Sequence, residues 1–282
     1  MNTYRFTFIF VFYFQWASMG RIQAQVLSIV LVAILAMWIL IRTKSIQFSY
    51  NLEMIRSGLK FGLPLIPHNV GSMILFITDR VIMNRFMRLS EVGVYSVAFQ
   101  LCGAMTLIAS SFNLAYAPWF YKQLRLKDNN TKKRIVKFTY RYFMGLLALG
   151  TLIYFGMTLV VPFFVGNKFT LSIKYFPYLL LSNIFGGMYF MVCHYIFYAE
   201  KTKYLALITF LSAILNIPLC YFLLQYYGTL SVVYSLVIIN LLIFLATWFA
   251  AQKSHLMPWF DNWTLVINKR NIRINKQTSH NY

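Results

Sequence analysis

The chain has 282 residues, of which 60% are hydrophobic and only 11% are charged. A soluble domain has about a quarter of its residues charged, so this composition excludes a globule in water and makes lipid the solvent. The charge is one-sided, with 26 Lys and Arg against 6 Asp and Glu. Because the basic residues lie between apolar runs and not along one stripe, they indicate membrane topology and argue against nucleic-acid binding.

Stretches without a charged residue recur along the chain, and a bilayer span needs about 20 apolar residues. They cover residues 6–20, 22–41, 61–78, 92–121, 142–167, 175–199 and 204–252. The last stretch is about twice the length of one span, and it divides at Tyr227-Gly228-Thr229, where glycine supplies a turn. The sequence therefore predicts an all-α integral membrane protein of about eight transmembrane helices.

The first of these stretches is short for a span. Residues 1–5 followed by an apolar run that ends near Ala17-Ser18-Met19 are compatible with a signal peptide. That region carries one positive charge and its core is crowded with Phe. We therefore expect a first transmembrane helix, joined to the second through Gly20 and Arg21.

Lys and Arg accumulate in the cytoplasmic loops of membrane proteins. In alternate loops of this chain the 26 basic residues divide into 20 on one side and 6 on the other. The richer side takes Arg5, the 42–60 linker, the dense 122–141 loop, Lys201 and Lys203, and the tail after Gln252. Both termini are therefore predicted to be cytoplasmic, with the tail disordered and its bases available to anionic membrane lipids.

No signature of a soluble enzyme is present. Cys102, Cys193 and Cys220 lie inside apolar runs without CxxC spacing, which is typical of small buried hydrophobic residues. A Gly-rich phosphate loop, HExxH, a nucleophile elbow and a carboxylate pair at catalytic spacing are all missing. We therefore predict no catalytic residue, no metal and no cofactor.

Several motifs together resemble the bacterial O-antigen and capsule flippases. They are Leu59-Lys60-Phe61-Gly62-Leu63-Pro64, Thr78-Asp79-Arg80, Glu91-Val92-Gly93-Val94-Tyr95, Ala115-Tyr116-Ala117-Pro118-Trp119, Asn216-Ile217-Pro218 and Gly20-Arg21-Ile22-Gln23. The pattern is similar to the Wzx-like members of the multidrug/oligosaccharidyl-lipid/polysaccharide exporter superfamily. The resemblance implies a non-enzymatic transporter in the bacterial inner membrane. It would move an undecaprenyl-pyrophosphate-linked oligosaccharide to the outer leaflet by alternating access between two lobes.

Such flippases usually have 12 to 14 helices in two lobes, which implies a division of this chain. Residues 1–41 would be the last two helices of an N-terminal lobe, and 42–56 a cytoplasmic basic linker. Residues 57–252 would form a complete six-helix C-terminal lobe, and 253–282 a cytoplasmic tail. About four N-terminal helices would be lacking. Candidate partners are therefore lipid-linked oligosaccharide, membrane lipids, other glycan assembly proteins and a missing N-terminal half.

Two features are candidate hinges. Pro64 and Pro67 lie early in the third predicted helix and remove backbone hydrogen bonds there, which makes either a bendable element facing a cavity or a static packed kink. Gly186-Gly187, in the middle of a later helix, permits close packing or bending.

Asp79 and Arg80 follow 18 uncharged residues, or about 27 Å of helix. This depth predicts an interfacial ion pair, since charge costs little near the interface. The alternative is that Arg80 and Arg85, with Asp79 orienting one of them, line a cavity where guanidinium groups hold a pyrophosphate.

Further candidate substrate contacts are His68, Gln100, Asn113 and His194. An ionisable group at membrane depth suggests function, although a neutral histidine bonded to a neighbour is the simpler interpretation. The amides of Gln100, Asn113, Asn183, Asn216 and Asn240 bind either sugar hydroxyls or neighbouring helices. No acid is predicted deep within a span, so no carboxylate is expected to relay protons.

Three other functions remain open besides the flippase. A cation-coupled multidrug antiporter of the same superfamily would need buried acids. A glycan polymerase or ligase would be expected to carry a substantial outer loop, which this chain lacks. A flippase remnant without transport follows if the four remaining helices of the N-terminal lobe are absent, because each lobe covers the polar cavity face of the other.

Overall fold

The computed structural model describes residues 17–44, 51–126, 128–164 and 167–259, which form helices joined by short turns. The chain divides into two compact units between Arg56 and Ser57. The first contains α2 (Ala17–Arg42), an apolar helix of 26 residues with Arg42 in its last turn. The helix predicted over residues 6–20 lies largely outside the described residues.

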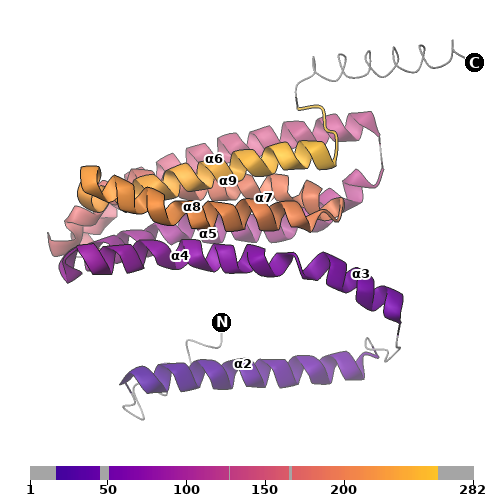
Figure 1. The fold of residues 1–282 in the computed structure, drawn as a ribbon, viewed down its shortest axis with the longest axis horizontal. Coiled ribbons are helices and arrows are strands. Elements are labelled where there is room, and N and C mark those ends of the chain that lie inside the picture. Colours follow the sequence, from indigo (N-terminus) through magenta and orange to yellow (C-terminus); the bar gives the residue numbers. More distant parts are fainter. Residues whose placement is uncertain (1–16, 45–50, 127, 165–166, 260–282) are drawn as a thin grey trace, which may run out of the picture. The chain divides into compact units, whose positions relative to one another are not determined.

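The second unit contains six long helices, which we call the six-helix lobe (Figure 1). They are α4 (Leu65–Phe86), α5 (Leu89–Leu124), α6 (Asn129–Phe164), α7 (Phe176–Tyr198), α8 (Thr202–Tyr227) and α9 (Ser231–Ser254). Two 3₁₀ turns, Asn167–Tyr175 and Gly228–Leu230, join α6 to α7 and α8 to α9. The second of these turns occupies the site where the sequence predicted the 204–252 run to divide, and Gly228 there has a φ of 53°.

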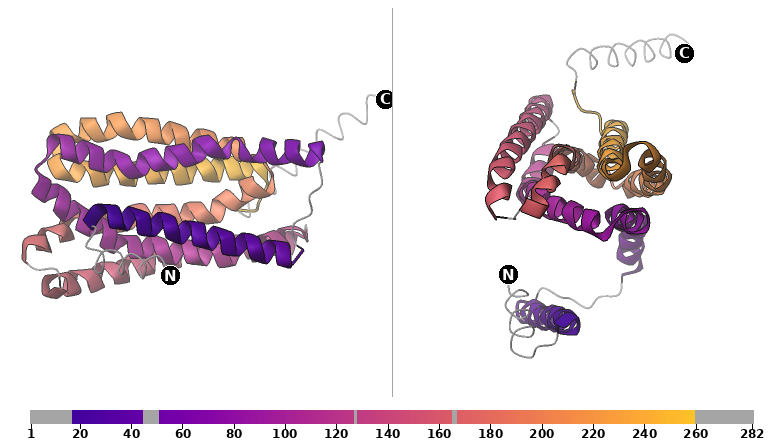
Figure 2. Two further views of the ribbon diagram at one scale, coloured as in Figure 1. Left: turned by 90° about the horizontal axis from the view of Figure 1, so that it is seen from below. Right: turned by 90° about the vertical axis from the view of Figure 1, so that its left-hand side faces the viewer.

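The interior of the lobe lies around α7. In the most apolar segment of the Thr170–Tyr198 stretch, 67% of the residues are buried, because α7 packs on α9, α5 and α6. On the other side α4 packs along α8, and α8 packs along α9, as the two turned views show (Figure 2). A Cβ atom on Gly71 of α4 would lie 3.0 Å from the backbone of Thr209 and Phe210. The α4–α8 contact is thus a close approach of two backbones, of the kind that small residues permit between membrane helices.

The helices α5 and α6 are longer than the bilayer requires. Each has 36 residues, or about 54 Å of helix, against a hydrocarbon core of about 30 Å. The predicted loop over 122–141 is therefore wrong in form. Only residues 125–128 separate the two helices, and most of the basic residues of that segment lie on the first turns of α6.

The linker predicted over 42–56 also differs, because α3 (Leu52–Gly62) begins within it. Asn51 accepts hydrogen bonds from the backbone N–H groups of Glu53 and Met54 at 2.9 and 3.2 Å, which caps the start of this helix. The chain then turns at Leu63 and Pro64 before α4 begins at Leu65. Since proline has no N–H to donate, it interrupts the helical ladder at this turn.

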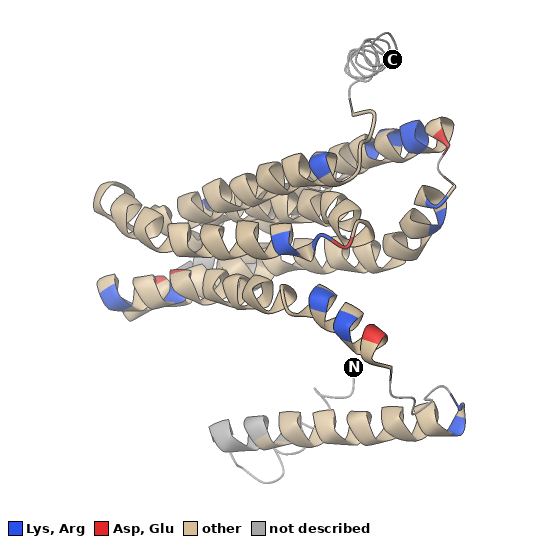
Figure 3. Ribbon diagram, turned by 45° about the vertical axis from the view of Figure 1, so that its right-hand side comes forward, with Lys and Arg blue, Asp and Glu red and all other residues tan. Residues whose placement is uncertain are grey.

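The predicted fold class, an all-α membrane protein, is confirmed. Six helical stretches of the described chain are long and apolar enough to cross a membrane, and the last, Thr202–Ser254, contains both α8 and α9. Basic residues gather mainly at the end of the lobe where α5 ends and α6 begins (Figure 3). We call this the basic end. It carries Lys122, Arg125, Lys132, Lys133, Arg134, Lys137, Arg141, Lys201, Lys203 and Lys253.

Candidate functional site

A cavity of about 480 Å³ lies inside the six-helix lobe. It lies among α4, α5, α7, α8 and α9, and its volume falls within the range of small-molecule sites. Its polar lining consists of His68, Ser72, Asp79, Thr106, Ser182, Asn183, Tyr189, Thr209 and Asn240. Since His68 and Asp79 are eleven residues apart on α4, the cavity follows that helix for about 16 Å. A polar cavity of this length inside an apolar bundle is typical of a transport path.

Asp79 is the acidic residue of this cavity, and it is 1% exposed. The hydroxyl of Tyr95, on α5, donates a hydrogen bond to its Oδ2 atom. Its other oxygen, Oδ1, is buried without a hydrogen-bond partner among the described residues. The carboxylate of Asp79 is therefore buried and not exposed as the interfacial interpretation assumed, while its depth in the membrane stays a prediction. The sequence prediction considered only the distance of Asp79 along its own helix, whereas α5 packs over this carboxylate.

Arg80 does not make the contacts that the sequence predicted, which were an ion pair with Asp79 or the binding of a pyrophosphate in a cavity. Its guanidinium donates to the carbonyl of Phe76 at 3.1 Å and lies over the rings of Phe76 and Phe99, 4.7 and 4.6 Å from their centroids. Cation–π contacts of this kind hold a guanidinium against an aromatic surface. Both rings line the cavity, so Arg80 covers the wall beside Asp79 and does not form an ion pair with it in the described structure.

His68 joins α4 to α8 at the other end of the cavity. Its Nδ1 lies 2.8 Å from the hydroxyl oxygen of Thr209. Both residues line the cavity, and Gly71, one turn further along α4, allows the close approach of the two helices. The geometry thus brings His68 and Asp79 to one cavity, as the sequence hypothesis required of substrate-contacting residues.

Amides and hydroxyls of α7 and α9 form the opposite wall. The side-chain amide of Asn240 donates to the Ser182 hydroxyl at 2.9 Å and to the Leu236 carbonyl at 3.0 Å. The Asn183 amide donates to the Cys102 carbonyl of α5 at 2.9 Å. These bonds use the amide N–H groups and leave carbonyl oxygens, which accept hydrogen bonds, beside the cavity. Gly186 lines the same wall.

His194 and Asn113 lie elsewhere, in a polar cluster between α5 and α7. The Nε2 atom of His194 lies 2.7 Å from the side-chain oxygen of Asn113, and Nδ1 lies 2.9 Å from the Tyr121 hydroxyl. An amide oxygen only accepts, so Nε2 carries the proton and Nδ1 accepts from Tyr121. Because every polar atom of the ring has a partner, this geometry favours a helix-joining role over substrate contact.

The remaining predicted residues lie away from the cavity lining. Gln100 and Arg85 are exposed, Pro64 forms the turn before α4, and Pro67 lies in the first turn of that helix. Gly187 faces the bundle, where an added Cβ would lie 2.8 Å from Leu146 and 3.3 Å from Ala109.

Sequence reasoning missed Tyr95, Ser182 and Thr209 as parts of the site. Tyr95 stands sixteen residues from Asp79 and on another helix, so no local spacing connects the two. Ser182 and Thr209 are short hydroxyl residues inside apolar runs, where such residues commonly bond their own helix. Only the packing of α7, α8 and α9 shows that they border a common space.

Residues 2–124 match the family described as "Polysaccharide biosynthesis protein". "Lsg locus putative protein 1" of Haemophilus influenzae is 24% identical over 209 residues, covering 73% of this chain and 52% of that protein. "Uncharacterized membrane protein" of the same organism is 29% identical over 205 residues, covering 69% and 48%. This chain thus spans about half the length of the curated relatives it matches.

The fold also matches a solved structure, described as "Crystal structure of MATE in the bent conformation". The TM-score is 0.68 with 15% identity, over 89% of this chain and 58% of that chain. At this identity the match speaks for the fold alone. The fold and the apolar helices define the class as a multi-pass membrane protein with a MATE-like fold.

The family match, the relatives and the fold agree with the resemblance to the Wzx-like polysaccharide flippases of the multidrug/oligosaccharidyl-lipid/polysaccharide exporter superfamily that the sequence motifs carry. This confirms the resemblance found in the sequence.

Proposed function

We propose that the chain takes part in moving a lipid-linked oligosaccharide across the bacterial inner membrane. The observation that carries the proposal is the polar cavity of the six-helix lobe, which contains Asp79 and His68 and opens among five helices of an apolar bundle. Polar groups at membrane depth are costly and mark substrate or ion pathways. The match to a polysaccharide biosynthesis family supports a glycan as cargo.

Alternating access would use the turn at Leu63 and Pro64. Repeat-built transporters expose a midplane site to each side in turn by rocking or by bending of a few elements. The turn ends one helix and begins α4, which carries both His68 and Asp79. A change of angle at this turn would move both cavity side chains together, because they lie on one continuous helix.

A cation-coupled transport cycle is favoured by one specific observation. Asp79 presents a buried oxygen, Oδ1, that no described group satisfies, beside a cavity that also holds the amide oxygens of Asn183 and Asn240. Carboxylate and amide oxygens are ligands for hard cations, and a carboxylate also accepts a proton. The same site would serve either coupling for glycan export or the multidrug antiport held open by the sequence.

We further propose that the basic end faces the cytoplasm. Its Lys and Arg residues outnumber those at the other end of the lobe, where Arg80, Arg85, Arg88 and Lys174 lie, and the positive-inside bias orients membrane helices accordingly. Residue 254, the end of α9, then lies on the cytoplasmic side. The cysteine of a K203C variant should react with a membrane-impermeant thiol reagent only after the cells are permeabilised, because the reagent then reaches the cytoplasm.

The function is tested by complementation of a bacterial strain that lacks its polysaccharide flippase. The chain is expressed alone and together with the N-terminal half of a full-length relative, because it spans about half of the relatives' length. Restoration of surface polysaccharide in either arm supports the proposal. Membrane-inserted protein that restores none in either arm contradicts it.

The same strains separate glycan export from drug antiport. Growth is measured in the presence of several cationic drugs, and a rise in resistance without surface glycan would favour the antiporter. Both outcomes should depend on Asp79, so the D79N variant shows whether either one uses the lobe cavity.

A further inference from the structure

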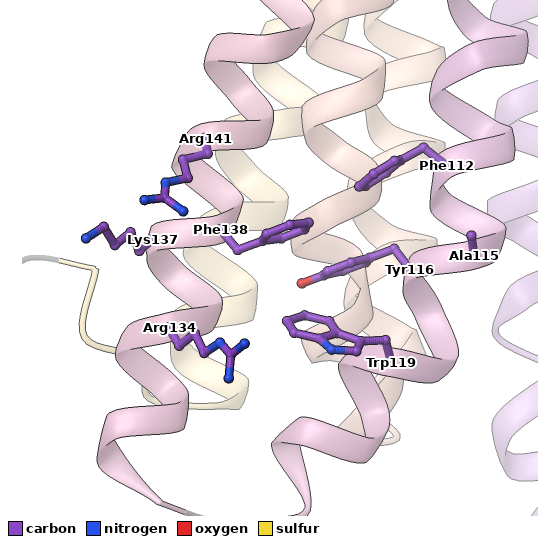
Figure 4. A pocket seen from close by; sticks show the side chains of 8 residues that line it. All are labelled: Phe112, Ala115, Tyr116, Trp119, Arg134, Lys137, Phe138 and Arg141. Carbon is purple, nitrogen blue, oxygen red and sulfur yellow. The ribbon is translucent and has the colours of Figure 1, made fainter.

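A second hollow lies at the basic end, between α5 and α6, outside the lobe cavity. Its volume is about 490 Å³. On α5 it is bordered by Phe112, Tyr116 and Trp119, and on α6 by Arg134 and Arg141. Each set recurs at three-, four- or seven-residue spacing, which places its members on one face of a helix. Aromatic residues of α5 and basic residues of α6 thus border one hollow, and Arg134 extends toward the rings (Figure 4).

The charged groups of this hollow lack counterions. Within the described residues no carboxylate forms an ion pair with Arg134, Lys137 or Arg141, and Asp128, close to them in sequence, accepts hydrogen bonds from Thr131 instead. All three cations are exposed. Figure 4 shows Arg134 extending toward Trp119, with Lys137 directed away from the rings. Such a cluster of unpaired cations creates a positive electrostatic potential that attracts an anion.

The position along α6 indicates what kind of anion fits. Arg141 directly precedes the charge-free run that begins at Tyr142, so the hollow lies where the apolar part of α6 ends. Lipid headgroups occupy this level, just outside a hydrocarbon core of about 30 Å. Half-buried aromatic rings favour the same interfacial level, and arginine side chains reach it from either direction.

We propose that this hollow is a binding site for the phosphate group of a membrane lipid. Arg134 and Arg141 would hold the phosphate oxygens, since guanidinium groups bind phosphate through paired N–H donors. Lys137 would close the outer side. Phe112 and Trp119 would pack on the first carbons beyond the phosphate. The site is separate from the lobe cavity and does not depend on what the chain transports.

The phosphate could belong to an anionic phospholipid or to a polyprenyl pyrophosphate, and binding measurements separate the two. The purified chain in detergent is titrated with phosphatidylglycerol, phosphatidylcholine or a polyprenyl pyrophosphate, and bound lipid is counted by native mass spectrometry. Wild type should bind at least one of the anionic lipids about tenfold more tightly than phosphatidylcholine. The lipid that binds identifies the source.

Variants then locate the binding. R134Q/R141Q should lose about tenfold or more in affinity, because charge-assisted contacts to phosphate are lost. K122Q/R125Q removes the same charge from the end of α5, outside the hollow, and should retain most of the affinity.

A second readout reports position without relying on charge. Brominated phosphatidylglycerol in nanodiscs should quench the fluorescence of wild type more than that of W119F. Equal affinity in wild type and R134Q/R141Q would overturn the proposal. So would equal losses in R134Q/R141Q and K122Q/R125Q, because the effect would then be one of net charge alone.

Discussion

The hydroxyl of Tyr95 donates a hydrogen bond to Oδ2 of Asp79, across the α4–α5 interface and inside the membrane-spanning lobe. The arrangement leaves Oδ1 without a partner in the described structure, beside a cavity lined by hydroxyls and amides. A carboxylate fixed on one side and free on the other is poised to bind a proton, a cation or a sugar hydroxyl.

Substitution of Tyr95 by Phe should destabilise the lobe. It deprives a buried carboxylate of its hydrogen-bond donor, at a cost of about 1–3 kcal/mol. Thermal unfolding in detergent, followed by fluorescence-detected size-exclusion chromatography, gives the measurement. Y226F removes a hydroxyl at a position that is 68% exposed and should leave the midpoint unchanged. Equal midpoints for Y95F and wild type would mean that the hydrogen bond does not stabilise the fold.

The close approach of α4 and α8 makes Gly71 sensitive to any side chain. A methyl group there would stand 3.0 Å from backbone atoms of Thr209 and Phe210, and overpacking of this kind costs about 1–3 kcal/mol. G71A should therefore lower the unfolding midpoint. Gly145 in α6 has open space around its ideal Cβ position, so G145A should leave stability equal or raise it by up to about 1 kcal/mol. A matched loss in both variants would refute the packing argument.

Substitutions of Pro64 and Pro67 should differ in their effect on transport, although the two residues are only three positions apart. Pro64 stands at the turn between α3 and α4, whereas Pro67 occupies the first turn of α4, where a missing N–H costs nothing. P64A should let the two helices join and should reduce transport in the complementation assay without lowering the amount of protein in the membrane. P67A should transport like wild type. If both variants behave like wild type, the turn does not act as a hinge.

The thermal stability of the lobe should depend on pH through His255, which follows α9. His255 lies between the rings of Tyr195 and Tyr198, and burial and the nearby Lys132 lower the pKa of its imidazole. The folded state therefore disfavours the protonated ring. Its contribution to stability is present above the ordinary histidine pKa of about 6.5 and is lost as the pH falls through the lower folded value.

The expected result is a decline in the unfolding midpoint of wild type between pH 7 and pH 5 that is smaller in H255Q. The remaining decline in H255Q reports other groups. A decline of equal size in both proteins would show that His255 does not contribute.

Much of the fold was predictable from the sequence because charge-free runs of membrane length are unambiguous. The break at Gly228 and the fold class follow from such runs. The ends of α5 and α6 did not, since Lys and Arg residues such as Arg134 and Lys137 are as compatible with a helix as with a loop. A helix that extends beyond the hydrocarbon core leaves no hydropathy signal.

The candidate site was predictable only in part. His68, Asp79, Asn183 and Asn240 stand out as polar residues within or beside apolar runs, and the structure brings them to one cavity. Their partners do not stand out, because Tyr95 and Thr209 reach them only through the packing of α5 and α8 on α4. The burial of Asp79 is a tertiary property, and depth along a single helix could not reveal it.

The central claim is that transport uses the lobe cavity through Asp79. The most direct measurement is surface polysaccharide in the flippase-deficient strain, in whichever expression arm restores it with wild type, compared among wild type, D79N and K203Q at equal amounts of membrane-inserted protein. We expect K203Q to restore wild-type levels and D79N to restore little or none. Restoration by D79N equal to that of wild type would contradict the account.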